Sequence, residues 1–86
     1  DVKVVIVDIS AVPLLDMTAL AALDNVLRDY RKQHVGLVLV GTSSRVRLKL
    51  RRAGILREEG HLDYVQNLEQ ARAKALSWLE PASVND

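Results

Sequence analysis

Two spacings of apolar residues alternate along this chain, and the changes between them mark the predicted elements. Residues 2–9 contain an almost unbroken β-branched run that is apolar on both faces, which predicts a central strand of a parallel or mixed sheet. Residues 35–40 have the same character and predict a second strand. From Asp16 the period becomes helical, with one apolar stripe at spacings of three and four: Leu20, Leu23, Leu27 and Tyr30. Strand, helix and strand in this order predict a right-handed parallel crossover.

Residues 45–52 fit two patterns. Apolar and basic residues alternate strictly, as in a half-buried strand, yet Val46, Leu50 and Ala53 also fit a helical stripe. We favour a helix, because Ser43 or Ser44 can cap its start and the Ala53-Gly54 pair can end it.

The last third of the chain predicts one more strand and one more helix. Residues 62–65 read as a short strand, Asn67 is placed to cap the following helix, and Pro81 ends it. The expected fold is therefore α/β, a sheet of mixed or parallel strands flanked by α-helices. We expect a single domain over residues 1–80 and a flexible tail over residues 81–86.

Composition narrows the class of protein. The chain has 86 residues, 49% of them hydrophobic, with no Phe and one Trp, so the core must be aliphatic. With no cysteine there is neither a disulfide scaffold nor a Cys-based zinc site. No apolar run approaches the roughly 20 residues of a membrane span. The net charge of +1 gives no overall attraction to nucleic acid, which we do not expect as a partner.

The start of the first helix holds the strongest candidate site. Asp16 is placed as the N-cap, and Thr18 falls in the first turn, opposite the apolar stripe and toward solvent. Ordinary capping explains both residues. The alternative is a modifiable hydroxyl, since a phosphate on Thr18 would add about −1.5 to −2 charges at a helix start. A docked partner would then be repelled or recruited.

A basic run follows in the second predicted helix. It contains no acid and comprises Arg45, Arg47, Lys49, Arg51 and Arg52. A solvated helix face is one explanation. The others are an anionic partner protein, lipid headgroups or a nucleotide. Nucleic acid is disfavoured, because no aromatic residues are interleaved for base stacking.

Catalytic and metal-binding patterns are weak. His34 and His61 have no ligand partners at metal spacing, so no metal site is expected. Glu58-Glu59 reads as a charged turn, and residues 41–44 are too short and lack the lysine of a phosphate-binding P-loop. We therefore expect a protein that is not an enzyme and needs no cofactor.

Two motifs resemble the STAS domain. The run from Val12 to Leu20, after a buried strand that ends at Asp8, is similar to the family's Asp-Ser/Thr-Ser/Thr-Gly-Leu loop. Residues 50–55, Leu-Arg-Arg-Ala-Gly-Ile, resemble its Leu-xxx-Gly-Leu/Ile element. The resemblance implies a regulatory, partner-binding loop over residues 16–19, in which Asp16 and Thr18 match the acidic and phosphorylatable positions. Met17 and Ala19 depart from the pattern.

The resemblance implies a role in regulation or protein interaction. Three features resemble the cytoplasmic STAS domains of SulP anion transporters, such as sulfate transporters. They are Ala19, the Arg-Arg-Ala-Gly-Ile segment and the Val-Pro pair at residues 12–13. The partner would then be the transporter's own membrane domain or a soluble regulatory protein, at the cytoplasmic face of the membrane. A free-standing anti-sigma factor antagonist, phosphorylated at Thr18, is the alternative. Nucleotide binding near Asp16–Thr18 is a third, weaker one.

The resemblance also bears on assembly. STAS domains usually begin with one or two further strands and a helix ahead of the strand at residues 2–9. Either the sequence is a piece of a longer domain, or a neighbouring chain completes the sheet. An uncovered strand edge is a template for pairing, so we expect the isolated chain to be marginally stable or to form homo-oligomers.

Overall fold

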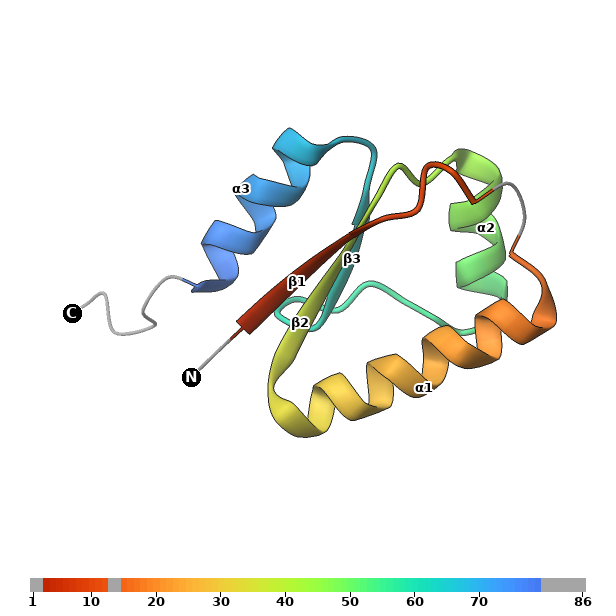
Figure 1. Ribbon diagram of the computed structural model, residues 1–86, viewed down its shortest axis with the longest axis horizontal. Coiled ribbons are helices and arrows are strands. Elements are labelled where there is room, and N and C mark those ends of the chain that lie inside the picture. Colours follow the sequence, from red (N-terminus) through yellow and green to blue (C-terminus); the bar gives the residue numbers. More distant parts are fainter. Residues whose placement is uncertain (1–2, 13–14, 80–86) are drawn as a thin grey trace.

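The structure, a computed structural model, describes residues 3–12 and 15–79 and contains three strands and three helices in alternation (Figure 1). The elements are β1 (Lys3–Asp8), α1 (Met17–Gln33), β2 (Val35–Val40), α2 (Ser44–Arg52), β3 (Leu62–Val65) and α3 (Leu68–Leu79). The strands form one parallel sheet in the order β1-β2-β3. This architecture confirms the predicted α/β class.

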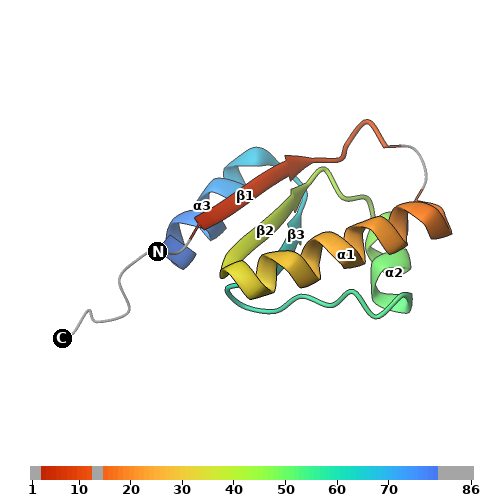
Figure 2. The same cartoon turned by 60° about the horizontal axis from the view of Figure 1, so that its bottom comes forward.

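Helices cover both faces of the sheet, and β2 lies in its centre (Figures 1 and 2). Every residue of β2 is buried, because successive side chains point to opposite faces and each face has its own core. Leu37 and Leu39 belong to the cluster on the α1 side, and Val38 and Val40 to the cluster on the α3 side. The two clusters are mainly aliphatic, and their aromatic members are Tyr30, Tyr64 and Trp78.

The prediction that residues 2–9 form a central strand is wrong for the sheet that the structure describes. β1 lies at one edge and pairs only with β2. Its run is apolar because helices cover both of its faces: Val5 packs on the α1 side, and Val4 and Ile6 pack on the α3 side. Coverage by helices and coverage by neighbouring strands leave the same pattern in a sequence.

The ambiguous segment is a helix, as predicted. The Ser43 hydroxyl accepts a hydrogen bond from the Val46 N–H at 3.2 Å, which caps the start of α2. Leu50 is fully buried in the α1-side cluster. After Gly54, which has a positive φ of 79°, the Ile55 N–H returns to the Leu50 carbonyl at 2.9 Å. The chain thereby re-enters the core at Ile55.

The last helix begins where the sequence indicates. The Asn67 side chain accepts a hydrogen bond from the Gln70 N–H at 2.8 Å. Ala71 and Ala75 are buried against the sheet, so α3 approaches it closely. The predicted stop at Pro81 and the tail over residues 81–86 lie outside the described residues, and the domain boundary at residue 80 stays a prediction.

Candidate functional site

The start of α1 presents a capped and exposed turn. The Asp16 carboxylate accepts a hydrogen bond from the Ala19 N–H at 2.8 Å, and the Asp16 carbonyl accepts one from the Leu20 N–H at 2.9 Å. Met17 is 83% exposed, an unusual position for a large apolar side chain. Thr18 is exposed as well, and so are Ala22, Asn25 and Asp29 on the same side of the helix. The cap and the solvent-facing hydroxyl are confirmed, whereas a regulatory role for them stays a prediction.

Buried neighbours hold this turn in place on both sides. Leu15, directly before the cap, is 7% exposed and belongs to the α1-side cluster. Ala19, directly after Thr18, is partly buried and packs against the same cluster. Ala19 therefore supports the turn from below. Asp16, Met17 and Thr18 form the exposed part of the turn, and a partner-binding role for residues 16–19 stays a prediction.

The basic helix α2 lies beside the start of α1 (Figures 1 and 2). Leu50 and Ile55, which anchor α2 and its exit, share one core cluster with Leu15, and Val46 packs against that cluster. The turn with Thr18 and the basic helix are therefore neighbours over a common core. Residues about thirty positions apart in the sequence form one end of the molecule.

The cations of α2 form two sets. Arg45, Lys49 and Arg52 are spaced by four and three residues, which places them on one face of the helix. Arg47 and Arg51 are four residues apart and form the other flank. Leu50 is buried between the two sets on the core side of α2, and the exposed Leu48 lies between them on the opposite side.

Among the described residues, Arg47 is the cation of α2 whose side chain has hydrogen-bond partners. Its Nη1 donates to the carbonyl of Thr42, and its Nη2 donates to the Ser44 hydroxyl at 3.2 Å. Thr42 is itself buried and donates its hydroxyl to the Val65 carbonyl at 3.0 Å. Arg47 thus fastens the loop between β2 and α2, while Arg45, Arg51 and Arg52 stay exposed.

Two ionisable groups elsewhere have clear local partners. A hydrogen bond to Ser10 holds the pKa of the Asp8 carboxyl below its ordinary value. The Arg31 guanidinium, at the end of α1, donates a hydrogen bond to Glu58 and lowers the pKa of that carboxyl. The charged turn at residues 58–59 therefore connects two helices, because Glu59 also accepts a hydrogen bond from the Trp78 indole at 2.9 Å.

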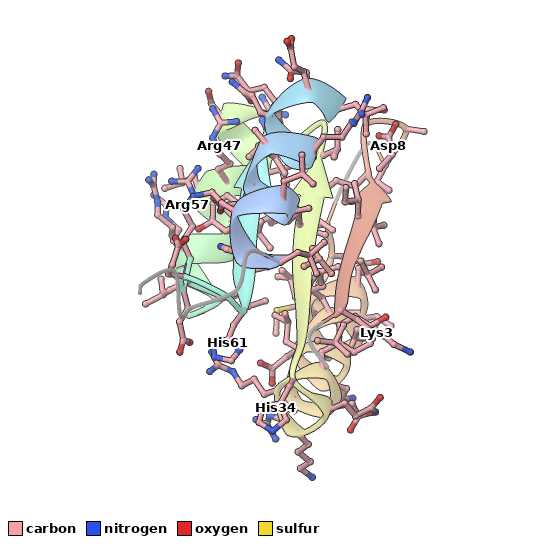
Figure 3. The ribbon with its side chains drawn as sticks, turned by 90° about the vertical axis from the view of Figure 1, so that its left-hand side faces the viewer. Lys3, Asp8, His34, Arg47, Arg57 and His61 are labelled. Atoms are coloured by element: carbon pink, nitrogen blue, oxygen red, sulfur yellow. The ribbon has the colours of Figure 1, made fainter. Side chains whose placement is uncertain are left out.

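The histidines lie far from the start of α1. Figure 3 shows His34 and His61 at one end of the sheet, with Asp8 and Arg47 at the other. The described part of the chain holds no group of three or more metal-ligating side chains. Nucleotide binding near Asp16 and Thr18 stays a prediction.

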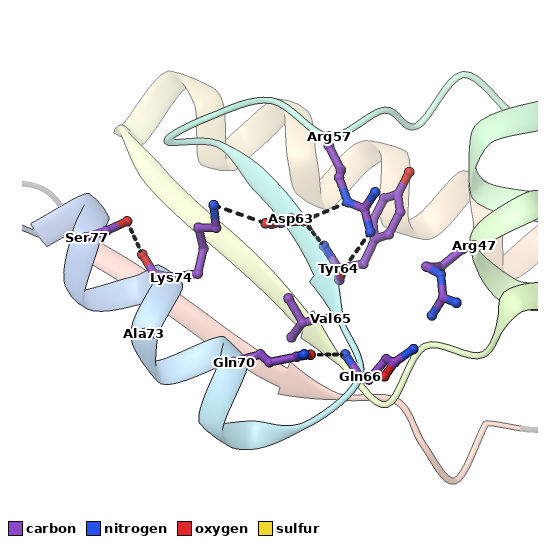
Figure 4. A pocket seen from close by; sticks show the side chains of 10 residues that line it. All are labelled: Arg47, Arg57, Asp63, Tyr64, Val65, Gln66, Gln70, Ala73, Lys74 and Ser77. Carbon is purple, nitrogen blue, oxygen red and sulfur yellow. Dashed lines mark hydrogen bonds and ion pairs between the residues drawn. The ribbon is translucent and has the colours of Figure 1, made fainter.

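The structure also shows a groove that the sequence did not reveal. It has a volume of about 850 Å³ and runs along the free edge of β3, between α2 and α3 (Figure 4). Arg47, Arg57, Asp63 and Lys74 supply its charged lining. These residues come from four separate segments, so no local pattern could have placed them together.

Comparison with protein-family models assigns the chain to a family. The family model of the STAS domain matches residues 1–75. No curated protein and no solved structure gives a significant match. Within the described segments, no helix combines the length and the apolar character that a membrane crossing requires. The parallel sheet with helices on both faces agrees with the family match, and the chain belongs to the STAS domain family.

Proposed function

We propose that this chain is the regulatory, protein-interaction domain of a SulP-type anion transporter, with no catalytic step of its own. It docks through the exposed turn Asp16–Thr18 and the neighbouring face Arg45, Lys49 and Arg52 of α2, which we call the docking face. The occupant is the membrane domain of the same transporter or a soluble regulatory protein on the cytoplasmic side. STAS membership supports the regulatory or protein-interaction role in general.

The observation that carries this proposal is a backbone turn, fixed on the core, that presents the exposed side chains of Met17 and Thr18 beside the cations of α2. Met17 and Thr18 project from a turn that the Asp16 cap and the buried Leu15 fix on the core. A backbone that is already ordered loses little conformational entropy when a partner binds the turn. Exposed Met is common at binding surfaces, because its unbranched chain adapts to different contacts.

The residues that favour the transporter branch lie in the two motifs. Ala19 stands where the antagonists usually carry glycine, and its side chain packs against the core cluster beneath the turn. The Arg-Arg-Ala-Gly-Ile segment at residues 51–55 forms the end of α2 and the re-entry at Ile55. Arg51 and Arg52 thus stay exposed beside a buried anchor.

Two measurements test this proposal. The reading frame that encodes the chain should contain the many apolar spans of a transporter upstream of it. In that transporter, replacing Arg45, Lys49 and Arg52 by alanine should change anion uptake at unchanged surface expression. A matched control replaces Arg28, Lys32 and Arg72, three exposed cations of α1 and α3, by alanine. Equal uptake by both triple variants would contradict docking through α2.

The second candidate is an anti-sigma factor antagonist, which the exposure of Thr18 favours. In this function a partner kinase would phosphorylate Thr18 and would then lose its affinity for the phosphorylated chain. Phosphorylation of the wild-type chain but not of Thr18→Val, together with a reading frame without membrane spans, would support this candidate over the transporter.

A further inference from the structure

The outer edge of β3 is closed by hydrogen bonds from side chains and from the backbone of Glu58. Among the residues that the structure describes, β3 pairs with β2 along one side only. The Leu37 N–H donates to the His61 carbonyl and the Gly41 N–H to the Val65 carbonyl, so alternate residues of this strand face β2. The backbone groups of Leu62, Tyr64 and Gln66 therefore point away from β2, and Tyr64 and Gln66 line the groove of Figure 4.

Nearly all of these outward backbone groups have partners. Leu62 exchanges two hydrogen bonds with the backbone of Glu58, each 2.9 Å long. The Tyr64 N–H donates to the Asp63 carboxylate at 2.7 Å, and the Tyr64 carbonyl accepts from the Arg57 guanidinium at 3.0 Å. The Gln66 N–H donates to the Gln70 side chain at 2.9 Å. A further strand would need these same donors and acceptors.

Asp63 holds the centre of this arrangement. One carboxylate oxygen accepts from Arg57 Nε at 2.8 Å, and the other lies 3.5 Å from Lys74 Nζ. The side chain of Asp63 is only 15% exposed, and the Arg57 guanidinium stacks 4.4 Å from the centre of the Tyr64 ring. Several contacts thus fix both residues, which lowers the entropic cost of each hydrogen bond to the edge.

This edge is not closed by steric obstruction. The groove of about 850 Å³ lies open beside β3, where a neighbouring strand would run. β1 provides a contrast at the other edge of the sheet. Its Ile9 N–H donates to Val40, so Val4 and Ile6 point their backbone groups outward, and within residues 3–12 and 15–79 no hydrogen bond reaches those groups.

We propose that Arg57 and Asp63 act as a guard that closes the β3 edge against strand addition, above all by β3 of a second copy of this chain. Unpaired strand edges are templates for association, and charged side chains on an edge are a known means of preventing it. Here the guard charges also bond the edge backbone directly. Removal of the guard frees the N–H and the carbonyl of Tyr64 for pairing across two copies.

The test measures self-association of the guard variant Arg57→Ala/Asp63→Ala by sedimentation velocity over a range of concentrations. All chains carry Val4→Pro, which removes an outward N–H of β1 and so suppresses pairing at that edge. The guard variant should associate about tenfold or more tightly than the Val4→Pro parent, since two hydrogen bonds of about 1 kcal/mol become available. The matched control, Asp24→Ala/Arg28→Ala, removes another exposed ion pair and should behave as the parent does.

Amide hydrogen exchange locates the new contact. In the associated guard variant, the amides of Tyr64 and Gln66 should gain protection as the concentration rises. The proposal is overturned if circular dichroism shows that the guard variant is folded and it nevertheless stays monomeric. It is also overturned if only the amides of β1 gain protection. If the double variant does not fold, Arg57→Ala alone is decisive, because this half-exposed side chain can be removed without opening the core.

Discussion

Gly36, the second residue of β2, has no room for a methyl group. A Cβ built on Gly36 would lie 2.8 Å from Cε3 and 3.0 Å from Cζ3 of Trp78, and 2.9 Å from the carbonyl oxygen of Gly60. Side-chain and backbone atoms therefore both crowd the position. Gly36→Ala must push α3 away from the sheet or shift the loop that contains Gly60.

The expected cost is the difference between two effects. Overpacking of a core costs about 1–3 kcal/mol. Replacing glycine by alanine also stabilises by about 0.4–1 kcal/mol, because the unfolded chain loses conformational freedom. The midpoints of the two ranges, about 2 and about 0.7 kcal/mol, leave a net destabilisation of about 1.3 kcal/mol, which in a domain of this size lowers Tm by roughly 5–10 °C.

Thermal unfolding, followed by circular dichroism and by tryptophan fluorescence, measures this cost. Trp78 is the single tryptophan of the chain, so its emission reports directly on the crowded site. In a Trp78→Leu background, followed by circular dichroism alone because no tryptophan remains, the two ring atoms are absent, and Gly36→Ala should cost less by about 0.5 kcal/mol or more. An unchanged Tm for Gly36→Ala, or an equal loss in both backgrounds, would refute the packing of α3 against β2.

Three further predictions concern the caps, the charges and the edge of the molecule. Asp16→Ala should destabilise the domain by about 0.5–2 kcal/mol in a denaturant titration, through loss of the hydrogen bond to the Ala19 N–H. Glu58→Gln should lower Tm at pH values above about 4, the ordinary carboxyl pKa, because the ion pair with Arg31 is present there. The difference in Tm between the variant and the wild type should vanish as the pH falls below the lowered pKa of Glu58. A Tm difference that grows toward low pH would contradict this assignment. The isolated chain should associate through β1 as its concentration rises, and Val4→Pro should reduce that association in sedimentation velocity.

Elements with a local signal were predictable from the sequence. The stripe from Leu20 to Tyr30, the Ser43 and Asn67 caps, and the stop at Gly54 all lie where the pattern places them, because each depends on residues within one or two turns. The pattern also placed Thr18 on the exposed side of α1. Periodicity within one helix determines that position, whatever the rest of the fold.

Features that depend on contacts between distant residues could not be predicted from the sequence. The edge position of β1 follows from the order of strands, which an apolar run does not encode. Arg47 belonged to a uniform basic run in the sequence, but the structure turns its guanidinium back to Thr42. The contact between Arg57 and Asp63 depends on the turn that brings Glu58 beside Leu62. Such contacts arise only when the segments meet in space.

The central claim is that the turn Asp16–Thr18 is a docking surface and not only a helix cap. The most direct measurement compares Thr18→Glu with the wild type in thermal unfolding and in a transport or partner-binding assay. The first turn of α1 holds no acid, so the new carboxylate should stabilise the helix slightly, by about 0.3–1 kcal/mol. Partner binding or transport should change clearly, because a docked partner must desolvate the added charge. Unfolding of Thr18→Glu, or full function at full stability, would contradict the claim.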